Sequence, residues 1–144
     1  MKLVKLKNIK YIGADIVPEI IKKNKKLKLK GYQFLTLNII KDSLPDVDLM
    51  LCRDCLTHLS YESIHQFLNN LSKTKIKYLL TTSYINNQEN KDIVTGNWRK
   101  LNFQKFPFNF PNPIDQLNEK CPLNGSEDKS LLLWEVTQLK YLLK

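Results

Sequence analysis

Apolar residues run from Val47 to Cys52, interrupted only by Asp48, and polar residues follow at once. A short apolar run of this kind predicts a strand buried on both faces, as in a parallel sheet. In open α/β sheets, ligands bind in the crevice at the carboxyl ends of the strands. Residues 46–60 are therefore the first candidate for a functional site. The polar side chains after the strand are Arg53, Asp54, Thr57, His58 and Ser60.

The same pattern predicts a strand, a helix and a second strand ahead of this stretch. Residues 9–15 and 32–40 are the predicted strands. The helix between them begins at Pro18, because proline suits the first helical position, and it stops at Gly31. A second helix follows Ser60, which is a natural N-cap, and residues 78–84 form the next predicted strand. The apolar stripe of that second helix is Ile64, Phe67, Leu68 and Leu71.

Two such units in succession predict a parallel sheet with right-handed crossovers. Residues 114–117 and 130–136 are predicted to form an antiparallel hairpin at the end of the sheet, and Thr137–Lys144 either extend it or form a short helix. We therefore predict one α/β domain over residues 1–144, with a Rossmann-like, mostly parallel sheet and a C-terminal antiparallel hairpin.

Residues 85–113 form a long segment that its prolines keep from being helical. Long ordered loops are usually functional, and an aromatic one can cap a pocket. The alternative, which is equally favoured, is that the rings complete the core. The aromatic residues of this segment are Trp98, Phe103, Phe106, Phe108 and Phe110.

The charge distribution suggests a further possible function for one segment only. The chain carries a net charge of +9, and lysines concentrate between Lys22 and Lys30. Affinity for nucleic acid is one interpretation, and a solvated face in a lysine-biased composition is the favoured one. No apolar run is long enough to cross a bilayer, and the N-terminus lacks the apolar core of a secretory signal. We expect a soluble, cytoplasmic protein without a membrane partner.

Three cysteines in such a chain do not indicate a disulfide framework. Cys52 and Cys55 form a C-x-x-C pair with His58 nearby, which allows a zinc site or a redox pair. No second paired motif supplies further ligands, and Cys52 ends the apolar run. Buried structural thiols are therefore the favoured interpretation, and no metal site is predicted.

Several segments together resemble the class I S-adenosylmethionine-dependent methyltransferases, in particular small domains with a C-R-D-x-L-x-H-L stretch. That stretch is Cys52–Leu59 (CRDCLTHL) here. Residues 11–18 resemble the second strand of the family, and residues 46–58 resemble its fourth strand and the motif after it. The other matching segments are 11–18 (YIGADIVP), 90–102 (NKDIVTGNWRKLN), 108–113 (FNFPNP), 128–131 (DKSL) and 133–134 (LW).

The resemblance implies S-adenosylmethionine as cofactor and methyl transfer to an unknown acceptor. It implies that Asp15 accepts hydrogen bonds from the ribose diol of the cofactor and that Ile16 lies beside it. It also implies that Asn38 hydrogen-bonds the adenine amine and that Ile39 packs on the adenine ring. Arg53, Asp54 and His58 would lie at the methyl-transfer point, where Asp54 or His58 acts as general base. Arg53 is placed there both as a cofactor contact and as a catalytic candidate; its alternative role is to hold Asp54. The implied acceptor-binding residues are Trp98, Arg99, Phe108 and Phe110.

One family feature has no counterpart in this sequence. The first strand and its glycine-rich turn should precede the second strand, but only eight residues, none of them glycine, precede Ile9. The resemblance thus implies an N-terminally truncated fold: the second and fourth strands pair directly, Met1–Lys7 fill the gap, or another chain does. A non-catalytic scaffold that pairs with a partner chain, and a basic nucleic-acid-binding module, are the two alternative functions.

Overall fold

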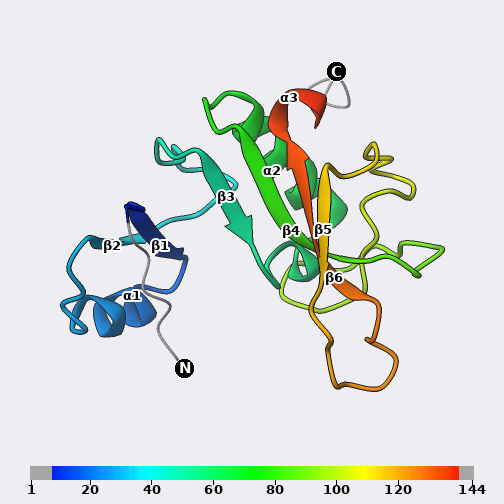
Figure 1. Ribbon diagram of the computed structural model, residues 1–144, viewed down its shortest axis with the longest axis horizontal. Helices are drawn as coiled ribbons and strands as arrows, with labels where there is room; N and C mark the ends of the chain where they lie inside the picture. The colour runs from blue at the N-terminus through cyan, green and yellow to red at the C-terminus, as the bar shows by residue number, and fades with distance from the viewer. Residues whose placement is uncertain (1–7, 140–144) are drawn as a thin grey trace. The chain divides into compact units, whose positions relative to one another are not determined.

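The computed structural model describes residues 8–139 of the 144-residue chain. They form two compact units, one within Met1–Asp42 and one within Ser43–Lys144 (Figure 1). The predictions for Met1–Lys7 and for residues 140–144 lie outside the described part of the chain.

The first unit is a strand, a helix and a strand: β1 (Tyr11–Asp15), α1 (Pro18–Lys25) and β2 (Tyr32–Thr36). The two strands are parallel, with Tyr11 opposite Tyr32 and Asp15 opposite Thr36. Helix α1 has proline in its first turn, as predicted, and buries Ile21. The order of strand, helix and strand is as predicted, but α1 ends at Lys25, six residues before the predicted stop at Gly31.

The second strand of this unit is shorter than the predicted 32–40. Strand β2 ends at Thr36 because Asn38 starts a turn: its Oδ1 accepts a hydrogen bond from the backbone N of Ile40 (3.0 Å). The backbone N of Asn38 in turn donates to Asp42 Oδ2 (2.8 Å). Asparagine favours such local hydrogen bonds over a ladder, which explains the early end.

The second unit contains a four-stranded sheet in the order β3-β4-β6-β5 (Figure 1). Strands β3 and β4 are parallel, whereas β6 lies between β4 and β5 and is antiparallel to both. This sheet is therefore mixed rather than mostly parallel. Its strands are β3 (Leu49–Cys52), β4 (Tyr78–Tyr84), β5 (Asp115–Asn118) and β6 (Lys129–Glu135).

The helices of this unit are η1 (Leu56–His58), α2 (Tyr61–Ser72) and α3 (Val136–Leu139). Helix α2 begins as predicted, because Ser60 Oγ accepts a hydrogen bond from the backbone N of Ser63 (3.2 Å). Its predicted stripe is buried, from Ile64 to Leu71. The core also contains Trp134 of β6, whose Nε1 donates to the carbonyl of Pro111 (2.9 Å).

The prediction that β3 is buried on both faces is wrong. Met50 and Cys52 lie on the more buried face, but Leu49 and Leu51 are 44% and 53% exposed. Strand β3 is an outer strand of its sheet, so fewer neighbours cover it than its apolar run suggests.

No helix in residues 8–139 is long and apolar enough to cross a membrane.

Candidate functional site

The chain leaves β3 through a left-handed residue, Asp54, whose φ is +52°. Aspartate tolerates this conformation better than most residues, although it is strained there. The backbone N of Asp54 donates to Thr82 Oγ1 of β4 (2.8 Å), which fixes the turn after β3 against β4. The carboxylate of Asp54 is thereby held at the carboxyl ends of β3 and β4.

Four charged side chains meet at this point. Lys129 Nζ lies 2.7 Å from Asp54 Oδ2 and 3.4 Å from Glu119 Oε2. Arg53 donates through Nε to Glu119 and lies 3.5 Å from Asp54. We call Arg53, Asp54, Glu119 and Lys129 the ionic cluster; it joins the end of β3, the residue after β5 and the start of β6.

Lys129 is the most enclosed member of the ionic cluster, with a side chain 10% exposed. Burial lowers the pKa of its ammonium, but hydrogen bonds and charge attraction from Asp54 and Glu119 outweigh that effect, so the pKa is raised. The sequence predicted Arg53 and Asp54 but missed Glu119 and Lys129. Local patterns give no signal for them, since Glu119 and Lys129 are 66 and 75 residues away from their partners.

His58 lies at the end of η1, and its Nδ1 is 2.9 Å from the carbonyl oxygen of Asn97. A carbonyl oxygen only accepts, so Nδ1 carries the proton in this hydrogen bond. In the neutral ring, Nε2 is then the nitrogen with a lone pair. A general base needs such a nitrogen.

The loop over residues 92–99 forms hydrogen bonds with residues 57–63. The backbone N of Gly96 donates to the carbonyl of His58 (2.8 Å), and Thr95 Oγ1 accepts from the backbone N of Ser60 (3.0 Å). The backbone N of Tyr61 donates to Asp92 Oδ1 (2.7 Å). These contacts hold the carbonyl of Asn97 against the His58 ring.

Arg99 is buried rather than displayed in a pocket. Its Nη1 donates to the carbonyl of Thr57 (3.0 Å), and its guanidinium lies over the ring of Tyr61, 5.4 Å from the centroid. Burial lowers the pKa of Arg99, although Tyr61 and Asp92 oppose the effect. The structure therefore uses Arg99 to tie the loop to η1, and its implied contact with an acceptor stays a prediction.

The three aromatic candidates fall into two groups. Phe108 and Phe110 are buried; Phe110 packs against Phe103 and Trp134 with ring centroids 5.0 and 5.2 Å away. Trp98, by contrast, is 50% exposed and contacts Tyr84 edge to face. Core packing accounts for the two phenylalanines, and only Trp98 offers a ring to solvent.

The cofactor candidates of the first unit lie at the carboxyl ends of its strands. Asp15 Oδ1 accepts a hydrogen bond from the backbone N of Val17 (2.9 Å), and Ile16 is exposed beside it. Asn38 and Ile39 follow β2 in the turn described above. A carboxylate and an amide at the ends of adjacent parallel strands suit the hydroxyl and amine groups of a nucleoside.

The cysteines are all free. Burial raises the pKa of the Cys52 thiol well above its usual value, and the neighbouring Cys55 adds to the shift. A thiol kept protonated in this way is a poor nucleophile and metal ligand. Residues 8–139 contain no group of three or more metal-ligating side chains.

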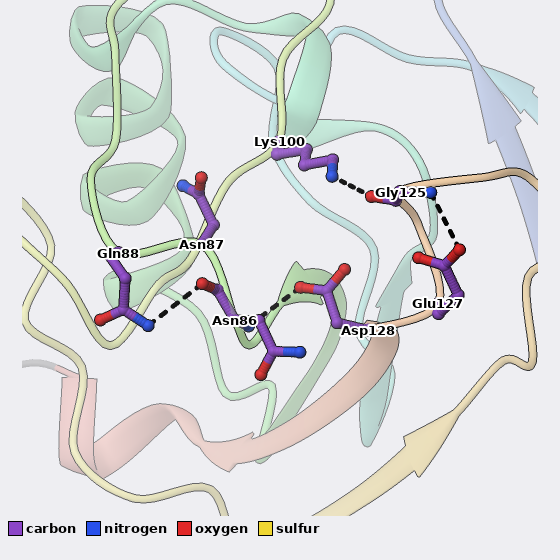
Figure 2. A pocket seen from close by; sticks show the side chains of 7 residues that line it. All are labelled: Asn86, Asn87, Gln88, Lys100, Gly125, Glu127 and Asp128. Carbon is purple, nitrogen blue, oxygen red and sulfur yellow. Dashed lines mark hydrogen bonds between the residues drawn. The ribbon is translucent and has the colours of Figure 1, made fainter.

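A polar hollow that the sequence did not predict lies where β4 ends and β6 begins. Its volume is about 310 Å³. Figure 2 shows Lys100 reaching the carbonyl of Gly125 and Asp128 accepting from the backbone N of Asn86 (2.9 Å). Asp128 precedes Lys129 of the ionic cluster. The lining residues are Asn86, Asn87, Gln88, Lys100, Gly125, Glu127 and Asp128.

Comparison with known proteins identifies the fold. No family model matches the sequence, and no curated protein matches it. The chain does align with the structure of N-methyltransferase NodS from Bradyrhizobium japonicum WM9, at 10% identity and a TM-score of 0.55, over 86% of this chain and 71% of NodS. NodS in complex with S-adenosyl-L-homocysteine aligns at 13% identity and 0.57, over 86% and 65%.

A predicted O-methyltransferase from Nostoc punctiforme PCC 73102 aligns at 14% identity and a TM-score of 0.52, over 87% of this chain and 43% of that one. At these identities the likeness establishes the fold alone. The chain has a methyltransferase-like α/β fold with a mixed sheet, and it spans less than two thirds of two of these three structures.

Proposed function

We propose that this chain is a methyltransferase-type domain that uses S-adenosylmethionine and methylates an acceptor still to be identified. The main support for this proposal is the alignment of 86% of the chain with a methyltransferase in complex with S-adenosyl-L-homocysteine. When bound, S-adenosylmethionine supplies a methyl group that is transferred by in-line displacement. The protein's own part is to position the acceptor and to remove a proton from it.

The general base in this proposal is His58. Its Nδ1 donates to the carbonyl of Asn97, which leaves Nε2 as the proton acceptor. Asp54 is the weaker candidate, because Lys129 lies 2.7 Å from its carboxylate and Arg53 lies 3.5 Å from it. Both cations lie against the same oxygen, Oδ2, so this oxygen is already engaged by groups of the protein. Arg53 and Lys129 hold Asp54 in place.

Asp15 would bind the ribose diol through its carboxylate. The hydrogen bond to the backbone N of Val17 orients that carboxylate at the end of β1 and uses only part of its acceptor capacity. Asn38 Oδ1 accepts from Ile40, and a second lone pair remains for an amine. Ile16 and Ile39 would supply apolar contact within the first unit. Arg53, in the second unit, stays a candidate cofactor contact that rests on the resemblance alone.

Trp98 is the aromatic candidate for the acceptor, because its ring is half exposed and lies against Tyr84 at the end of β4. Phe108, Phe110 and Arg99 are buried, so their part in the acceptor site would be structural.

Calorimetric titration of the chain with S-adenosylmethionine and S-adenosyl-L-homocysteine tests the proposal. We expect saturable binding that Asp15→Asn weakens by about tenfold, the loss of one charged hydrogen bond. Asparagine keeps an oxygen for the backbone N of Val17, so the start of α1 is preserved. Glu19→Gln, an exposed carboxylate of α1, is the matched control and should bind like the wild type. If the wild-type chain binds neither compound, the proposal is wrong.

The second candidate is a non-catalytic or incomplete subunit whose fold another chain completes. It is favoured by the exposed Leu49 and Leu51 on outer strand β3. An apolar outer strand is a template for a further strand.

Sedimentation of the chain at increasing concentrations tests whether a further chain pairs at β3. Leu51→Lys should abolish association without lowering the melting temperature, because its side chain is already 53% exposed. An unchanged complex in the Leu51→Lys variant would argue against pairing at β3.

A further inference from the structure

The positive charge of the chain is concentrated in the first unit. Residues 1–42 contain 11 of the 23 basic residues and 3 of the 14 acidic ones, so they carry +8 of the net +9. A uniform bias in composition would put only about +3 there. The composition of the chain alone therefore does not account for the charge of this unit.

Two lysines of this unit, Lys25 and Lys28, border a hollow that contains aromatic rings. It has a volume of about 450 Å³ and lies along β2 and the segment before it. Lys25 and Lys28 are exposed at its rim. The residues lining it are Lys25, Lys28, Leu29, Tyr32, Gln33, Phe34 and Leu35.

The rings are held in a fixed arrangement. Tyr11 lies with its ring centroid 4.9 Å from that of Tyr32 and 6.3 Å from that of Phe34. Gly13 leaves room for the Phe34 ring, because a Cβ on this glycine would lie 2.9 Å from Phe34 Cδ1. Positions opposite each other in a parallel pair share a face, so Tyr11, Tyr32 and Phe34 lie on one face of the sheet.

We propose that this hollow binds single-stranded nucleic acid. Lysines beside aromatic rings are the combination that binds single strands, because the cations contact phosphates while bases stack on the rings. The proposal does not depend on methyl transfer, since the ligand is bound by the first unit alone. Charge attracts the strand, and the aromatic rings distinguish it from a simple polyanion.

Fluorescence anisotropy of a labelled 12-nucleotide single strand, titrated with the full chain at several salt concentrations, tests the proposal. We expect the logarithm of the binding constant to fall linearly with the logarithm of salt concentration. The double variant Lys25→Gln/Lys28→Gln should weaken binding and reduce the slope by about 1.4, about 0.7 for each phosphate contact. Tyr32→Leu should weaken binding about fivefold or more without changing the slope.

The matched control is Lys73→Gln/Lys75→Gln, which removes the same charge from two exposed lysines of the second unit. It should leave the slope unchanged, and circular dichroism should show that all variants are folded. An equal loss in this control would overturn the proposal, because it would mean that net charge alone drives binding. Equal displacement of the strand by heparin, or tighter binding to anionic lipid vesicles, would overturn it as well.

Discussion

Lys129 Nζ lies 2.7 Å from the carboxylate of Asp54, across 75 residues of sequence. The contact joins the start of β6 to the turn after β3, two strands that β4 separates. The same ammonium lies 3.4 Å from Glu119, whose side chain is almost as buried as that of Lys129. Lys129 thus balances two carboxylates at the edge of the sheet where His58, the candidate general base, lies.

Lys129→Met should lower the free energy of unfolding by about 3 kcal/mol, because it leaves the enclosed Glu119 carboxylate with one cation fewer. Urea denaturation monitored by circular dichroism measures the change. Lys77→Met is the control: it breaks the ion pair with Asp48, in which both side chains are largely exposed, and should cause no measurable change. Equal midpoints for wild type and Lys129→Met would contradict the structural role of the ionic cluster.

The buried thiol of Cys52 makes stability depend on alkaline pH. Its pKa is raised in the folded protein, so the group remains protonated when the unfolded chain ionises near pH 8.5. The stabilisation is therefore fully present below about pH 8.5 and decreases as the pH rises, by about 1.4 kcal/mol per unit. Burial raises the pKa of Tyr84 as well, so this residue adds a loss of the same sign above about pH 10.

Urea midpoints measured at pH 8, 9 and 9.5 test this dependence. Cys52→Ala should flatten the decrease above pH 8.5, whatever its effect on stability at pH 7. Cys121→Ala, a substitution at a partly exposed cysteine, should retain the wild-type slope. A slope shared by all three proteins would show that other groups cause the decrease.

Local patterns predicted the elements whose signals are contained within a few residues. Strand β4 occupies residues 78–84 as predicted, and α2 begins after the Ser60 cap with its apolar stripe buried. Strand β2 ended early because the Asn38 side chain forms a turn that an apolar count does not register. The exposure of Leu51 depends on the order of strands in the sheet, which no local pattern contains.

The candidate site divides in the same way. Arg53, Asp54 and His58 follow one apolar run, so the sequence could single them out. Glu119 and Lys129 could not be predicted, because only the pairing of β6 between β4 and β5 brings Glu119 to Arg53 and Lys129 to Asp54. The roles of the candidate residues in cofactor and acceptor binding stay predictions.

Substitutions of the aromatic residues in segment 85–113 should affect the free energy of unfolding in two different ways. Phe110→Ala should lower the free energy of unfolding by about 3–5 kcal/mol, because a buried ring against Phe103 and Trp134 is replaced by a cavity. Trp98→Ala should change it by about 0.5 kcal/mol or less, since half of that ring is already in solvent. Urea denaturation of both variants tests the difference, and similar losses would contradict it.

Arg99 should control the tautomer of His58. The guanidinium binds the carbonyl of Thr57, and the same loop presents the carbonyl of Asn97 to His58 Nδ1. We expect nitrogen NMR to show neutral His58 protonated at Nδ1, with His65 as the internal reference. Arg99→Met removes a charge-assisted hydrogen bond and should lower the free energy of unfolding by about 1.5–3 kcal/mol.

In the folded Arg99→Met protein, the Nδ1-protonated fraction of His58 should fall, because the loop no longer holds its carbonyl against the ring. Arg99→Lys keeps one cationic donor for Thr57 and should lie between the two. The His65 spectrum should be the same in all three proteins, since its ring contacts Phe108 rather than the loop carbonyl. A His58 tautomer that is unchanged in Arg99→Met would mean that η1 alone orients the ring, and Arg99 would then serve stability only.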